Sequence, residues 1–175
     1  MLFHSTRGGD KDRTFEDILM QGLASDGGLF MPDTWPQVNL NLLRSKSSFI
    51  EVAKEIVPLF TSSSFDKEEV INILDNTWHD FSDDDIAPLK HLDDNKAVLE
   101  LFHGPTAAFK DFGLQLAAAF FNEVLSKNNK TAIILGATSG DTGSAAIDAC
   151  KNFKSIKTFI LIPDGNMSEI QRRQM

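Results

Sequence analysis

The sequence contains little cysteine, no long hydrophobic run and no excess of basic residues. Cys150 is the only cysteine in 175 residues, so an internal disulfide is excluded and a reducing compartment is favoured. No apolar run approaches the roughly 20 residues that cross a bilayer. The start, MLFHSTRGGDKD, lacks the apolar stretch of a secretory signal. We therefore predict a cytoplasmic protein with no membrane partner.

The charge balance is acidic, with a net charge of −8 and a pI near 4.9. Nonspecific binding to nucleic acid needs a basic face, so no nucleic-acid partner is expected. Apolar residues make up 42% of the chain, which is enough for a folded core. The four histidines show no ligand spacing, which argues against a metal site; they are His4, His79, His91 and His103.

The first part of the chain shows the periodicity of helices. Thr14 is a candidate N-cap for a helix over FEDILMQGLA, and two further amphipathic patterns cover residues 47–60 and 65–81. A polar, loop-like stretch then covers 82–96. The sequence therefore predicts a mostly helical region over 1–95 and a second region over 96–175.

The second region alternates short apolar runs with helical patterns. We expect strands at 97–102, 130–137 and 156–163, each followed by a helix. Such alternation predicts an α/β fold with parallel, right-handed βαβ units, in which ligands bind beyond the carboxyl ends of the strands. Three strands are few for such a sheet, and the last helical pattern runs to the end of the sequence. We therefore expect a part of a longer protein.

Lys110 is the first candidate for chemistry. It stands between Phe109 and Phe112 in HGPTAAFKDFG, where an expected strand turns into a helix. An ammonium group in apolar surroundings loses solvation, which makes its amine more nucleophilic and suited to Schiff-base formation with a carbonyl group. The alternative is a lysine that extends to solvent from the first helical turn, or one paired with Asp111.

The second candidate is GATSGDTGS, residues 136–144, which follows the second expected strand. Its glycines allow close approach of a ligand to the backbone, and its hydroxyls could bind an anion together with the N–H groups of a helix start. The alternative is an ordinary capped turn between a strand and a helix. The segment lacks the Gly-Lys-Ser/Thr ending of a phosphate-binding P-loop.

Three further features each have a structural alternative. Asp141–Ser144 spells the DTGS of aspartic proteases, but those enzymes use two such loops in an all-β fold, and here a helical pattern follows. His103 could line a site or make a structural hydrogen bond. Arg7 could bind an anion or could be an exposed terminal charge.

Four motifs, in order along the chain, resemble the threonine synthase family of fold-type II pyridoxal-phosphate enzymes. HSTRGG with FEDILMQGLASDGGLFMP is similar to the family's opening segment, and ELFHGPTAAFKDFG to its cofactor-lysine motif. GATSGDTGSAA is similar to its substrate-binding loop, and LIPDGNMSEIQRRQM to the segment after the next strand. The resemblance implies a sheet domain like that of the tryptophan synthase β chain, with 96–175 as its first part.

The resemblance also implies roles for individual residues. Lys110 would hold pyridoxal 5′-phosphate covalently and later carry protons, with Phe109 and Asp141 also contacting the cofactor. The substrate-binding residues would be Thr138, Ser139, Gly140 and Thr142. The implied reaction converts O-phospho-L-homoserine and water to L-threonine and phosphate, and the chemistry is supplied by the cofactor.

Alternatives from other classes stay open at this point. One is another fold-type II lyase, such as a threonine or serine dehydratase, and another is a noncatalytic relative that binds a phosphate-bearing ligand. The family's cofactor-phosphate loop and the group facing the pyridine nitrogen come later than these motifs. Residues 1–175 by themselves are therefore expected to bind the cofactor weakly and to lack turnover. The sequence leaves open whether the protein is a monomer or a dimer.

Overall fold

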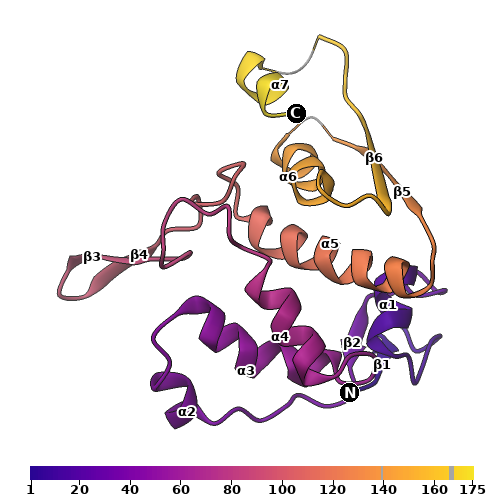
Figure 1. Ribbon diagram of the computed structural model, residues 1–175, viewed down its shortest axis with the longest axis horizontal. Helices are drawn as coiled ribbons and strands as arrows, with labels where there is room; N and C mark the ends of the chain where they lie inside the picture. The colour runs from indigo at the N-terminus through magenta and orange to yellow at the C-terminus, as the bar shows by residue number, and fades with distance from the viewer. Residues whose placement is uncertain (139, 166–167) are drawn as a thin grey trace. The chain divides into compact units, whose positions relative to one another are not determined.

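A computed structural model describes residues 1–138, 140–165 and 168–175 of the chain (Figure 1). By its internal contacts the chain divides into two compact units, Met1–Asn76 and Thr77–Met175. The predicted boundary after residue 95 stays a prediction, because a compact unit need not coincide with a domain. Within the described residues, no helix has the length and apolar character that crossing a membrane requires.

The unit Met1–Asn76 consists of helices and one short antiparallel strand pair. Its elements are β1 Phe3–Ser5, α1 Phe15–Gln21, β2 Phe30–Pro32, α2 Leu40–Arg44, α3 Phe49–Thr61 and α4 Lys67–Asp75. The predicted cap of α1 is confirmed, since Thr14 accepts a hydrogen bond from Asp17 N–H in a capping box. The mostly helical character predicted for this region is therefore confirmed for residues 1–76.

Helix α4 is shorter than the pattern over 65–81 predicts. Val70, Ile73 and Leu74 do form its buried face, as predicted. The helix ends at Asp75, however, and the Asn76 side chain donates a hydrogen bond to the carbonyl of Asn72 at 2.8 Å. Such a local bond competes with helix continuation. Trp78 therefore lies outside the helix.

In its described residues, the unit Thr77–Met175 contains a hairpin, three helices and a parallel strand pair. Its elements are β3 Leu89–Asp93, β4 Lys96–Leu99, α5 Lys110–Lys127, β5 Ala132–Ala137, α6 Asp141–Cys150, β6 Ile156–Leu161 and α7 Glu169–Gln174. β5 and β6 pair in parallel register from Ala132↔Ile156 to Ala137↔Leu161. With α6 between them they form a βαβ unit, which confirms the predicted α/β class.

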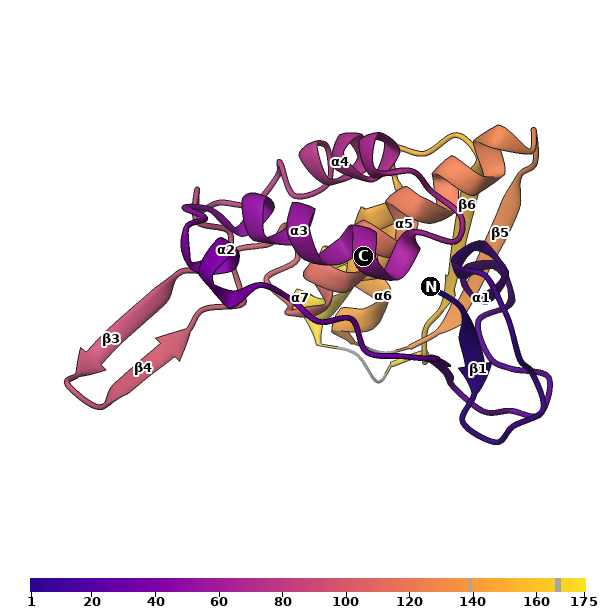
Figure 2. The same ribbon diagram turned by 90° about the horizontal axis from the view of Figure 1, so that it is seen from below.

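The prediction for the stretch before α5 is wrong in two respects. First, the run 97–102 does not begin the parallel sheet, because β4 pairs antiparallel with β3. Second, β3 lies inside the segment that the sequence predicts to be a loop. The two strands form a ribbon (Figure 1, Figure 2) whose residues are all exposed. The missed signal is the turn between them, where Asn95 N–H donates to the Asp93 carboxylate at 2.9 Å.

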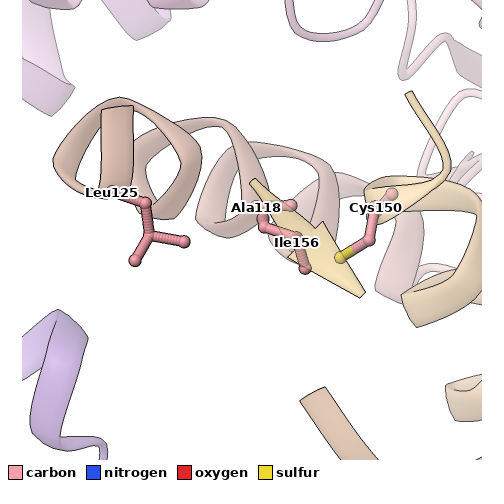
Figure 3. Packing of buried hydrophobic residues seen from close by; sticks show 5 residues of the cluster. Ala118, Leu125, Cys150 and Ile156 are labelled. Carbon is pink, nitrogen blue, oxygen red and sulfur yellow. The ribbon is translucent and has the colours of Figure 1, made fainter. Parts of the chain in front are cut away.

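The core of this unit joins α5, α6 and β6. Its buried members, several of which Figure 3 labels, are Ala118, Leu125, Ala149, Cys150 and Ile156. Side chains alternate along the strands, so the opposite face of the strand pair exposes Ile133, Leu135, Phe159 and Leu161. The buried face therefore packs α5 against α6 and α6 against β6.

Candidate active site

The two motifs selected from the sequence meet at the start of two neighbouring helices. Lys110 is the first residue of α5 and Asp141 is the first residue of α6, and these helices lie side by side (Figure 1). Lys110 Nζ lies 2.8 Å from Asp141 Oδ2, which is the distance of a charge-assisted hydrogen bond. The ion pair therefore links segments 31 residues apart in the sequence.

Phe109 and Phe112 do not form the apolar enclosure predicted for Lys110. The Phe109 ring lies under the amine, with its centroid 4.5 Å from Nζ, but Phe109 is 61% exposed. Phe112 packs instead against Phe81, with ring centroids 5.0 Å apart. The physical reason is that side chains next to each other in a helix point in different directions. Two phenylalanines close to Lys110 in the sequence therefore need not surround its amine in the folded chain.

The partner of Lys110 also differs from the one that the structural alternative predicts. Asp111 does not pair with Lys110, because its carboxylate is fully buried and accepts two hydrogen bonds from Thr106. The bond from Lys110 holds the pKa of Asp141 below its ordinary value. At neutral pH Asp141 therefore faces the Lys110 amine as a carboxylate.

The segment after β5 forms a helix start with accessible polar groups. The N-cap of α6 is Gly140, which has no side chain to cap the helix, and its own N–H donates to Thr138 Oγ1 at 3.2 Å. Thr142 is exposed in the first turn. The N-terminal end of a helix favours negative charge, so this end suits an anionic ligand group. Ser139 lies outside the described residues, so its predicted role has no structural counterpart here.

The DTGS sequence lies in a helix rather than in a protease loop. Asp141, Thr142, Gly143 and Ser144 are the first residues of α6. Ser144 is buried and its hydroxyl donates to the Asp141 carbonyl at 3.2 Å. The aspartic-protease alternative is therefore excluded by the local fold.

The remaining candidates have structural partners. His103 Nε2 lies 2.8 Å from Glu100 Oε2, which is the hydrogen-bonded alternative considered for this histidine. Arg7 is exposed, and its guanidinium donates to the backbone carbonyl of Asp26 at 2.9 Å. Among residues 1–138, 140–165 and 168–175, no group of His, Cys, Asp and Glu side chains is arranged to hold a metal ion.

The resemblance implies that Asp111, which follows the lysine, orients it, but sequence reasoning missed the buried cluster around this carboxylate. Thr106 and Asp111 are both buried, and Gly104 lies against the Asp111 carboxylate. The available signal was the spacing, since a hydroxyl residue five positions before an aspartate at a helix start can bond to its carboxylate.

The structure agrees with the predicted fold-type II pyridoxal-phosphate class. It contains a βαβ unit, and the lysine at the start of α5 faces the glycine- and hydroxyl-rich start of α6. A sequence model described as "Threonine synthase N terminus" matches residues 2–78. Threonine synthase of Pseudomonas aeruginosa is 45% identical over 100% of this chain and 38% of its own length. "Threonine synthase-like 2" of Xenopus laevis is 38% identical over 100% of the chain and 38% of its own length.

Solved structures agree with these sequences. The crystal structure of threonine synthase from Brucella melitensis, described as PLP-bound, superposes with a TM-score of 0.94 at 41% identity. The match covers 99% of this chain and 38% of that one. The chain therefore belongs to the threonine synthase family, of which it matches the N-terminal portion. It spans 38% of the length of these relatives.

Proposed function

We propose that this chain supplies the lysine-bearing part of a threonine synthase, which converts O-phospho-L-homoserine and water to L-threonine and phosphate. The observation that carries the proposal is the 2.8 Å contact between Lys110 Nζ and Asp141 Oδ2 at two adjoining helix starts. The similarity to named threonine synthases over the whole chain supports the substrate and the reaction.

The residues present fit pyridoxal 5′-phosphate. An amine is the group that binds the cofactor's aldehyde, and Lys110 presents one whose side chain is 27% exposed. Asp141 Oδ2 could accept a hydrogen bond from the cofactor, and the Phe109 ring offers an apolar surface beside the amine. When bound, pyridoxal phosphate acts as an electron sink for carbanion chemistry.

The chain's own residues would then bind, orient and transfer protons. Lys110 Nζ would hold the cofactor until the substrate amine replaces it, and would afterwards accept and return protons at the substrate carbons. Thr138, Gly140 and Thr142, with Ser139, would bind the substrate carboxylate through hydroxyl and N–H groups at the start of α6. We propose residues 96–175 as the first part of the cofactor-binding domain, because both Lys110 and Asp141 lie there.

Trapping of the cofactor on the lysine tests the assignment. The protein is mixed with pyridoxal phosphate, reduced with borohydride and mapped by peptide mass. We expect a pyridoxyl group on Lys110 and its loss in Lys110→Arg, which keeps the positive charge. Lys127, at the other end of α5, serves as the control lysine in the same digest. Equal labelling of both lysines would contradict a selective cofactor site.

The products separate the synthase from the alternatives. Phosphate release from phosphohomoserine indicates the synthase, whereas ammonia release from threonine or serine indicates a dehydratase. A noncatalytic relative would release neither phosphate nor ammonia, even with Lys110 labelled. We test for such a relative because one similar protein is named "Threonine synthase-like 2". Where residues 1–175 are inactive by themselves, they can be joined to the remainder of the Pseudomonas aeruginosa enzyme beyond the matched region.

We also propose a cytoplasmic location and no nucleic-acid partner. The first rests on the single cysteine, Cys150, which is buried and unpaired by any disulfide. The second rests on the net charge of −8. Fractionation of cells expressing the tagged protein, and a binding assay with duplex DNA at low salt, check these two statements.

A further inference from the structure

A buried carboxylate lies immediately after the proposed cofactor lysine. Asp111 has no exposed surface, although it is the second residue of α5. Its Oδ2 accepts the Thr106 N–H at 2.9 Å, and its Oδ1 accepts the Thr106 hydroxyl at 2.6 Å. Burial of a carboxylate is costly unless hydrogen bonds satisfy it, so these two bonds are needed for Asp111 to occupy this position.

The loop before α5 is shaped around this carboxylate. A Cβ on Gly104 would lie 2.4 Å from Asp111 Oδ2, so only glycine leaves room there. Ala107 has a φ of 56°, in the left-handed region that alanine rarely adopts. Its N–H donates to the Gly104 carbonyl at 3.0 Å, which closes the turn. Such a backbone persists only where its surroundings hold it, and Thr106 next to Ala107 is held by Asp111.

This loop determines where α5 begins. The N-cap residue, Phe109, makes no side-chain capping bond, and the Asp111 N–H donates to the Ala108 carbonyl at 3.0 Å. The first turn is therefore fixed by the loop and by the Asp111 carboxylate rather than by a capping side chain. Lys110 is the first residue of that turn. Successive helix residues point about 100° apart, so Asp111 can face the loop while Lys110 faces Asp141.

We propose that Asp111 is a positioning residue: through its two hydrogen bonds to Thr106 it fixes the loop 104–108 and thereby the place of the Lys110 amine. Asp111 does not touch the reacting groups, and it acts through the backbone of the lysine beside it. The inference that this serves cofactor attachment rests on the proposed function, whereas the positioning of the amine can be measured without cofactor.

The first experiment measures the amine directly. The intact protein is labelled with trace acetic anhydride, and the acetylation of Lys110 is divided by that of Lys127 on the same helix. We expect Thr106→Val and Asp111→Asn to raise this ratio, because the amine is no longer held against Asp141. Thr106→Ser keeps both donors and should leave the ratio at the wild-type value. An unchanged ratio in Thr106→Val and Asp111→Asn would overturn the proposal.

A control separates positioning from general destabilisation. Thr61 is a buried threonine in the unit Met1–Asn76 whose hydroxyl donates to the Val57 carbonyl at 3.3 Å. Thr61→Val removes a comparable hydroxyl far along the chain from the lysine. If it raises the Lys110/Lys127 ratio as much as Thr106→Val does, the effect is loss of stability and the positioning role is refuted.

The second experiment tests the link to the cofactor. The rate of pyridoxal phosphate attachment to Lys110, measured by borohydride trapping over time, should fall on the order of tenfold or more in Thr106→Val, as displacement of a reacting group by about an ångström produces. Thr106→Ser should restore it. If the wild-type protein shows no selective attachment, the proposed function fails while the acetylation ratio still decides the positioning role.

Discussion

Two helical glycines with opposite surroundings test the packing of α6 on the parallel strands. Gly143 lies in the first turn of α6, where a Cβ would come within 2.8 Å of Thr138 Cγ2 and 3.2 Å of Ile160 Cγ2. The flexible end of Met175 lies at 2.7 Å from the same point. Gly113 lies near the start of α5, and a Cβ there would meet nothing within 4 Å. The comparison of Gly143→Ala with Gly113→Ala therefore isolates the contact.

The expected magnitudes follow from this difference. Replacement of a helical glycine by alanine where space is free stabilises by about 0.4–1 kcal/mol, chiefly because the unfolded chain loses freedom. Gly113→Ala should show this gain. Gly143→Ala has the same gain, but forcing a methyl group against two β-branched side chains costs about 1–3 kcal/mol. Gly143→Ala should therefore be less stable than Gly113→Ala by about 1–3 kcal/mol.

Urea unfolding of the purified chain followed by tryptophan fluorescence measures the difference. Trp78 is the one tryptophan between Thr77 and Met175, and it is 6% exposed. In a Trp35→Phe background it reports on that unit alone. Equal free energies of unfolding for the two alanine variants would refute the close approach of α6 to β6 at Gly143.

Three further predictions concern the unit Met1–Asn76. The Arg13 side chain, with a backbone N–H, holds the pKa of Asp10 well below its ordinary value. The stability that this carboxylate contributes is therefore present above about pH 4 and is lost as the pH falls further. Urea titrations at several pH values should show that Asp10→Asn weakens this loss of stability at acid pH. Leu74→Ala, at a side chain with no exposed surface, should cost about 2–5 kcal/mol, whereas Leu40→Ala at 59% exposure should change stability by less than about 0.5 kcal/mol by the same assay. Asp66→Ala removes the N-cap of α4 and should lower the thermal midpoint through a loss of about 1 kcal/mol, and recovery of most of it by Asp66→Ser would identify capping as the cause.

Much of the local structure could be predicted because it depends on neighbours in the chain. The Thr14 cap and the buried face of α4 follow from short-range spacing, and both are found. The β5–α6–β6 unit is confirmed as well, because its alternation of apolar runs and glycine turns is also local. The prediction that 97–102 begins the parallel sheet failed because apolar character predicts a strand without specifying its partner. In the structure β4 pairs with β3 in a hairpin.

The sequence by itself selected the residues that we propose to carry chemistry, since the motifs around Lys110 and Asp141 are continuous in the chain. Tertiary structure alone decided their surroundings. It placed Asp141 rather than Asp111 against the Lys110 amine and left Phe109 exposed. The reason is geometric: neighbours along a helix point in different directions, while packing of α5 on α6 joins helix starts 31 residues apart.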